Sequence, residues 1–147
     1  MSTRPIPLSQ VLDGADRAAT RVAFGRGGER LRSDLVRDVA ALAAGIAAVG
    51  TGRWLLSTAD SYATAVGLLA LASCRSLAVL PPNRRPETLR RLADGAVGAL
   101  VDGAGAVAAG LPVLDPLAAR SAVSGAAPTL DRDWPLVELW TSGTTGR

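Results

Sequence analysis

The stretch RWLLSTADSYATAVGLLALASCRSLAVL, residues 53–80, decides the fold of this chain. Its two ends, Arg53–Ser57 and Ser76–Leu80, are short apolar runs with the length of buried strands. The segment between them is apolar nearly all round, which predicts a buried helix that Asp60 or Ser61 caps. A strand, a helix and a second strand in this order predict a parallel pair joined by a right-handed crossover.

The segment before this stretch predicts another helix. Apolar residues recur at steps of four and three from Leu35 to Val49, as on one face of an amphipathic helix. Ser33 is expected to cap this helix, Asp34 to lie in its first turn and Gly50 to end it. The residues from Val22 to Leu31 surround a glycine-rich turn, which is compatible with a small hairpin.

The same alternation continues downstream. Pro86 suits the first turn of a further helix. Short apolar runs predict strands at Val97–Val101, Leu111–Leu114 and Leu136–Trp140. Parallel strands that are covered on both faces are apolar almost throughout, as these runs are. The sequence therefore predicts an α/β fold with a mostly parallel sheet flanked by helices.

The composition excludes several classes of chemistry. The chain has 147 residues, of which 48% are hydrophobic, so one folded domain is expected rather than disorder. The absence of histidine excludes a Ser-His-Asp triad and an imidazole base, and one cysteine cannot form an internal disulfide or a Cys-rich zinc site. A net charge of +3 is too small to indicate nucleic-acid binding. The most apolar window, residues 63–72, is too short to span a membrane, and no signal-peptide pattern begins the chain, so a cytoplasmic location is expected.

The most informative motif is the segment TSGTTG at residues 141–146. Four hydroxyl side chains alternate with two glycines, which let the backbone turn sharply and approach a ligand closely. Successive N–H groups in such a turn form an anion-binding concavity, and the position after a strand places it at the carboxyl edge of the sheet. This predicts a loop that wraps nucleotide phosphates; the alternative is an ordinary Ser/Thr/Gly turn. The spacing of glycines matches neither a P-loop nor a dinucleotide fingerprint.

The segment Leu139–Arg147 resembles the signature phosphate loop of the adenylate-forming superfamily, which includes acyl-CoA synthetases, adenylation domains of peptide synthetases and luciferases. The resemblance extends less specifically over residues 20–147. It implies an N-terminal arm, residues 1–20, and a partial AMP-binding subdomain of a larger ligase, residues 21–147, truncated at the phosphate loop. Within the superfamily, Asp60–Tyr62 and Leu80–Asn83 resemble bacterial ligases of aryl-polyene and fatty-acid-like gene clusters.

The resemblance also implies an activity. Such enzymes join a carboxylic acid to the α-phosphate of ATP, with Mg²⁺, and pass the acyl group to the thiol of CoA or an acyl carrier protein. The cofactor-binding residues that the resemblance transfers to this chain are Thr141, Ser142, Gly143, Thr144, Thr145 and Gly146. The family's catalytic lysine has no counterpart in a chain without lysine, so these residues alone are expected to be inactive. The alternative is a catalytically inactive α/β binding or interaction domain.

Three further expectations concern single residues. Arg84, Arg85, Arg90 and Arg91 form a local basic cluster, which is either a contact for the phosphates of CoA or a carrier protein or a solvated helix face. Cys74 is expected to be a small core residue, and Trp54 and Trp140 to lie in the core. The last strand is expected to leave an exposed edge that promotes oligomerisation or poor solubility.

Overall fold

The computed structural model describes residues 19–25, 28–102, 110–118, 129–130 and 134–140. A two-stranded antiparallel hairpin, β1 (Arg21–Gly25) and β2 (Gly28–Leu31), precedes the main sheet. The main sheet contains the strands β3 (Arg53–Ser57), β4 (Leu77–Leu80), β5 (Gly98–Val101), β6 (Val113–Leu114) and β7 (Val137–Leu139). The helices are α2 (Arg32–Val49), α3 (Ser61–Ser73) and α4 (Pro86–Leu92).

The main sheet is parallel at every pairing, in the order β6-β5-β3-β4-β7. In the central strand, Leu55 pairs with Val79 on one side and Ala99 on the other. The α/β fold with a parallel sheet flanked by helices, predicted from the alternation of strands and helices, is confirmed. Because all the strands run the same way, the loops that leave their carboxyl ends meet at one edge of the sheet.

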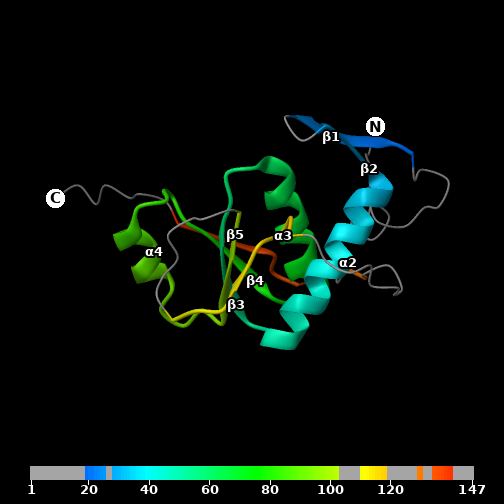
Figure 1. Cartoon of the computed structure of the whole chain (residues 1–147). Coiled ribbons are helices and arrows are strands. Elements are labelled where there is room, and N and C mark those ends of the chain that lie inside the picture. The colour runs from blue at the N-terminus through cyan, green and yellow to red at the C-terminus, as the bar shows by residue number, and fades with distance from the viewer. Residues whose placement is uncertain (1–18, 26–27, 103–109, 119–128, 131–133, 141–147) are drawn as a thin grey trace, which may run out of the picture.

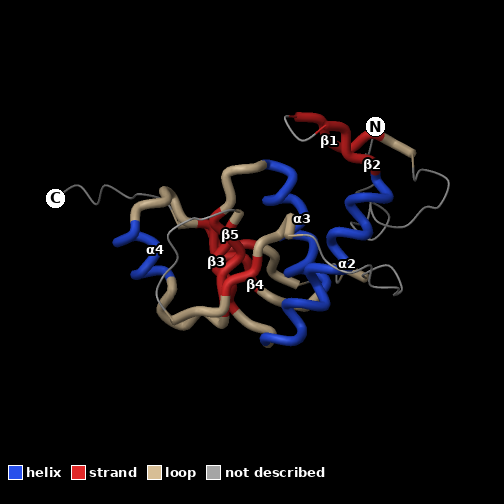
Figure 2. The backbone as a smooth tube through the Cα atoms, viewed as in Figure 1, coloured by secondary structure: helices blue, strands red, loops and turns tan. Residues whose placement is uncertain are grey.

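The helices form a layer on each face of this sheet. Helices α2 and α3 pack together on one face, and α4 lies on the other (Figure 1; Figure 2). The side chains of β3 alternate between the two layers, as a pleated strand requires. Trp54 and Leu56 are buried against α2 and α3, whereas Leu55 is buried in the smaller cluster with Leu89 and Leu92 of α4. Coverage on both faces explains why the strands are apolar throughout.

The helix starts differ partly from the sequence prediction. Helix α2 begins at Arg32, so Ser33 is already helical and its predicted role as the N-cap is wrong. Leu31 is the extended residue before the helix, and its N–H donates to a carboxylate oxygen of Asp34 at 3.0 Å. Asp34 lies in the first turn, as predicted, and its carboxylate satisfies the N–H of Leu31 there. At α3 the cap is Asp60, whose carboxylate accepts the N–H of Ala63 at 2.8 Å.

The strands occupy the predicted positions but are shorter. Residues 76, 97, 111–112, 136 and 140 lie outside the strands to which the sequence pattern assigned them. Burial does not explain every such position, since Ser76 is fully buried outside its strand whereas Trp140 is 42% exposed. Among the residues that the structure describes, no helix combines the length and the apolar character needed to cross a bilayer.

Candidate functional site

The carboxyl edge of the sheet is the place where this topology brings polar loops together. Strand β3 is followed by α3 on one face, whereas its neighbour β4 is followed by α4 on the opposite face. The chain passes from β3 to β4 in one direction along the sheet and from β5 to β6 in the other, so the topological switch point lies between the adjacent strands β3 and β5. Ligands of open α/β sheets bind outside the carboxyl ends of the strands at such a point.

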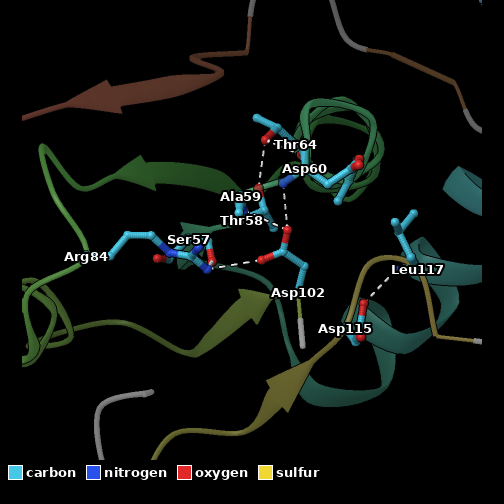
Figure 3. A network of polar contacts seen from close by, with 10 residues as sticks. Ser57, Thr58, Ala59, Asp60, Thr64, Arg84, Asp102, Asp115 and Leu117 are labelled. Atoms are coloured by element: carbon cyan, nitrogen blue, oxygen red, sulfur yellow. Dashed lines mark hydrogen bonds and ion pairs between the residues drawn. The ribbon is translucent and has the colours of Figure 1, made fainter. Parts of the chain in front are cut away.

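Asp102 links three loops at this edge. It follows β5 directly, and one of its carboxylate oxygens accepts the backbone N–H groups of Ala59 and Asp60, at 2.6 and 2.7 Å. The other oxygen accepts Nη2 of Arg84 at 3.0 Å. The same nitrogen donates to the carbonyl oxygen of Ser57 at 3.1 Å, so Arg84 reaches from the β4–α4 loop back over the end of β3 (Figure 3). One carboxylate thereby holds together the ends of β3 and β5 and the loop after β4.

A second set of contacts closes the start of α3. The hydroxyl of Thr64 donates to the carbonyl oxygen of Asp60 at 3.0 Å and lies 2.7 Å from the hydroxyl of Thr58 (Figure 3). Two N–H donors at the start of α3 already have anionic partners from the chain itself, because the Asp102 carboxylate accepts the N–H of Asp60 and the Asp60 carboxylate accepts the N–H of Ala63. A helix N-terminus is an ordinary site for phosphate. Here two carboxylates take that position, so a phosphate group would meet like charge.

The electrostatics of Asp102 follow from these contacts. Partial burial favours the neutral form of its carboxyl group, but the N–H groups of Asp60 and Ala59 and the guanidinium of Arg84 favour the charged form more strongly. The pKa of Asp102 is therefore lowered below its ordinary value. At neutral pH the carboxylate is charged, and its oxygens are hydrogen-bonded to two loops of the chain. The side chain of Asp102 is 16% exposed.

Strand β7 leads to the loop that the sequence singles out. Leu139 pairs with Leu80 of β4, so Trp140 leaves the sheet at the carboxyl edge, beside the β4–α4 loop. The predicted phosphate loop, residues 141–146, follows Trp140 directly and lies outside the described residues. Trp140 was predicted to be buried, and this is wrong because its side chain is 42% exposed. In the described sheet β7 has a neighbour on one side, which leaves this end of the strand in contact with solvent.

An ion pair between Arg53 and Glu138 connects β7 to β3 on the face of the sheet that carries α4. Arg53 donates from Nε and Nη2 to the two carboxylate oxygens of Glu138, at 3.3 and 3.1 Å. The indole N–H of Trp140 donates to the same carboxylate, which it shares with Arg53. The hydrogen bonds from Arg53 and Trp140 lower the pKa of Glu138. Sequence reasoning considered Glu138 only as a metal ligand, which it rejected, and did not assign a role to Asp102; an acidic residue directly after a buried strand was the available signal for Asp102.

The other candidates lie apart from this edge or have structural partners. Of the basic cluster, Arg84 forms the ion pair with Asp102, whereas Arg85, Arg90 and Arg91 are exposed on or beside α4. Cys74 is half-buried; its thiol donates to the carbonyl oxygen of Ala43, and burial raises its pKa, as suits an unreactive core residue.

Two further features of the described residues bear on ligands. They contain no cluster of three or more His, Cys, Asp or Glu residues that could hold a metal ion. An open pocket lies at the end of α3, lined by Ala72, Ser73, Arg75, Thr129 and Leu130. Because α3 ends where β4 begins, this pocket is at the amino edge of the sheet, away from the loops described above.

A doubly wound parallel sheet with helices on both faces defines the class, an open α/β fold, and proteins of this class bind ligands at the carboxyl edge of the sheet. No model of a known protein family matches the sequence, and no curated protein matches it. Solved structures do match. The N-terminal subdomain of Klebsiella oxytoca NpsA, in complex with 3-hydroxybenzoyl-AMSN, is 23% identical with a TM-score of 0.72, over 96% of this chain and 39% of that one.

Two ligases also share the fold. O-succinylbenzoate coenzyme A synthetase (MenE) from Bacillus subtilis, in complex with AMP, is 17% identical with a TM-score of 0.66, over 92% of this chain and 39% of that one. A malonyl-CoA ligase bound to methylmalonyl-CoA and AMP is 19% identical with a TM-score of 0.69, over 95% of this chain and 30% of that one. The chain therefore has the fold of the N-terminal subdomain of adenylate-forming enzymes, as predicted. It spans about 40% or less of the length of these proteins.

Proposed function

We propose that this chain is the phosphate-binding part of an ATP-dependent acid–thiol ligase. The observation that carries the proposal is the position of β7, whose last residue, Leu139, pairs with Leu80 at the carboxyl end of β4, and residues 141–146 follow Leu139 and Trp140 in the sequence. Ligands of open α/β sheets bind at this edge. That fold is shared with proteins whose structures hold AMP or an AMSN compound, which supports ATP as the ligand.

The occupied N-terminus of α3 also favours this loop as the phosphate site. A polyphosphate needs several donors without competing negative charge, and the carboxylates of Asp60 and Asp102 exclude it from the start of α3. The loop after β7 offers backbone N–H groups and four hydroxyls within six residues and contains no acidic residue. Thr141, Ser142, Thr144 and Thr145 are the proposed phosphate contacts, and Gly143 and Gly146 give the backbone its close approach.

The reaction that we propose for the whole enzyme has two steps. A carboxylate oxygen attacks the α-phosphorus of ATP, the bond to pyrophosphate breaks, and an acyl-adenylate forms. A thiolate then attacks the acyl carbon and AMP leaves. In the first step a phosphate loop acts by positioning the polyphosphate and stabilising its charge. The acceptor thiol in this proposal belongs to CoA or to an acyl carrier protein.

The proposal is tested by measuring ATP affinity by calorimetry, with Mg²⁺ present, for the wild-type chain and for Thr144→Ala/Thr145→Ala. Each lost hydrogen bond to a charged phosphate is expected to weaken binding by about tenfold or more. The control, Thr51→Ala/Thr88→Ala, removes the same two hydroxyls at positions outside the loop and should bind as the wild type does. Equal affinity of the loop variant and the control would contradict the proposal.

A further inference from the structure

We propose that Glu138 is a positioning residue for the phosphate loop and fixes the point at which the chain leaves β7. The inference rests on the proposed function of residues 141–146. It adds a residue to which neither the sequence motif nor the comparisons draw attention. Its basis is a continuous set of contacts that begins in the central strand and ends one residue before the loop.

The first contact in this set joins two strands that are not neighbours. Arg53 lies at the start of β3 and Glu138 in β7, with β4 between them. Two nitrogens of the guanidinium donate to the two oxygens of Glu138, which is the bidentate geometry that orients both groups. The third nitrogen, Nη1, donates to the carbonyl oxygen of Asp94 at 3.0 Å. Arg53 is thus anchored independently of β7 and provides a fixed reference for Glu138.

The second contact joins Glu138 to Trp140, the residue that precedes the loop. Glu138 and Trp140 are two residues apart, so their side chains point to the same face of an extended chain. The indole N–H of Trp140 donates to Oε1 of Glu138, the oxygen that also accepts Nη2 of Arg53. Thr141, the first residue of the proposed phosphate loop, follows Trp140 directly. Glu138 therefore orients the last residue before the loop relative to β3.

Strand β7 needs such an anchor because its own pairing is short. It has three residues, and its described ladder consists of three residue pairs with β4. A slip of one residue in a strand moves every side chain to the opposite face. Such a slip would take Glu138 away from Arg53 and would shift the start of the loop along the sheet edge. The ion pair thus fixes the register where backbone pairing alone is weak.

A purely structural role is the competing explanation. Glu138 and Arg53 have side chains that are each 32% exposed, and partly exposed ion pairs contribute little to global stability. The two roles make different predictions for a substitution that keeps the shape of the side chain. A positioning role predicts a change confined to Trp140 and the loop, with nucleotide affinity altered. A structural role predicts at most a small loss of stability, with the loop and its affinity unchanged.

The experiment compares Glu138→Gln with Glu87→Gln, a control that makes the same substitution at an exposed position on α4. In nitrogen–proton NMR spectra of the labelled chain, Glu138→Gln is expected to shift the indole resonance of Trp140 and the amide resonances of residues 141–146. Glu87→Gln should leave those resonances in place. Loop and indole resonances that are identical in Glu138→Gln and the wild type would overturn the proposal without any nucleotide being added.

A second measurement links the position of the loop to function. ATP affinity is expected to fall about five- to tenfold in Glu138→Gln, and similarly in Trp140→Phe, which keeps an aromatic ring but lacks the indole donor. Wild-type affinity in Glu138→Gln would overturn the positioning role even if the loop resonances shift. A wild-type chain that binds no ATP would contradict the proposed function instead, and the spectra alone would then decide whether Glu138 positions this segment.

Discussion

Asp102 illustrates, at the scale of the residue, how one carboxylate organises the candidate site. It satisfies two backbone N–H groups before α3 and the guanidinium of Arg84 from the β4–α4 loop. The contacts come from two parts of the sequence, residues 59–60 and Arg84, which are up to 43 residues away from Asp102. The consequence is that the β3–α3 and β4–α4 loops have fixed positions relative to the end of β5 before any ligand arrives, which lowers the entropy that binding would have to overcome.

Replacing Asp102 by alanine should therefore destabilise the chain. The two N–H groups and Arg84 lose their acceptor, and because they are partly accessible, water replaces some of the lost bonds. We expect a loss of about 1–2 kcal/mol in the free energy of unfolding, measured by urea denaturation. Asp94→Asn, at an exposed carboxylate after α4, is the matched control and should change the free energy by less than about 0.5 kcal/mol.

The same residue predicts a pH dependence. The pKa of Asp102 is lowered in the folded chain, so its contribution to stability is fully present above the unfolded pKa of about 3.9 and is lost as pH falls through the lower folded value. The free energy of unfolding should decrease below about pH 4, and it should decrease less steeply in Asp102→Asn, which has no proton to take up. Equal slopes for the two proteins in acid would show that the Asp102 contacts do not form as described.

The fit between elements depends on a small residue in β5. Gly98 is the register partner of Trp54, whose fully buried ring packs between the sheet and helices α2 and α3. A Cβ atom at position 98 would lie 2.5 Å from the ring, and the ring is held in place by an indole hydrogen bond to the carbonyl oxygen of Gly50. Such overlap cannot be relieved without moving a strand or the largest side chain of the core.

Gly98→Ala is therefore expected to lower the free energy of unfolding by about 1–3 kcal/mol, measured by chemical denaturation. Gly45→Ala in α2 is the matched control, since a Cβ there would meet only a leucine methyl at 3.4 Å and alanine favours helix. This control should be neutral or stabilising. A wild-type stability for Gly98→Ala would indicate that β5 and β3 pack less closely than the structure describes.

The sequence predicted these elements because each leaves a strong local pattern. The apolar runs around Trp54 and Val79 and the four-three spacing in α2 identify strands and a helix without tertiary information. The pattern could not predict that Asp34 rather than Ser33 satisfies the start of α2, since that depends on the extended path of Leu31. It also could not predict that Trp140 is exposed, because burial of an edge strand depends on which strands lie beside it.

The whole molecule presents two open edges in the described sheet, at β6 and β7. Beside β7, Leu139 is 71% exposed, Trp140 42% and Trp134 39%. An edge strand with unpaired backbone groups and apolar side chains is a template for pairing with another chain. The topology could be predicted from the order of strands and helices, but the exposed fractions of these side chains could not.

The chain is therefore expected to self-associate at micromolar concentration, measured by light scattering. Leu139→Lys should shift the distribution towards the monomer, because a charged side chain on an edge strand opposes strand pairing. Val22→Lys, at an exposed apolar residue of the hairpin, is the control and should not change the association. A monodisperse wild-type monomer would contradict the expectation that the chain associates through the exposed edge of β7.

The claim that residues 141–146 bind a nucleotide polyphosphate is tested most directly by titrating the nitrogen-15-labelled chain with ATP and Mg²⁺. The account predicts saturable shifts of the Gly143 and Gly146 amide resonances, while those of Ala59 and Asp60, already bonded to Asp102, stay in place. Shifts that gather instead at Ala59 and Asp60, or loop resonances that do not respond, would contradict it.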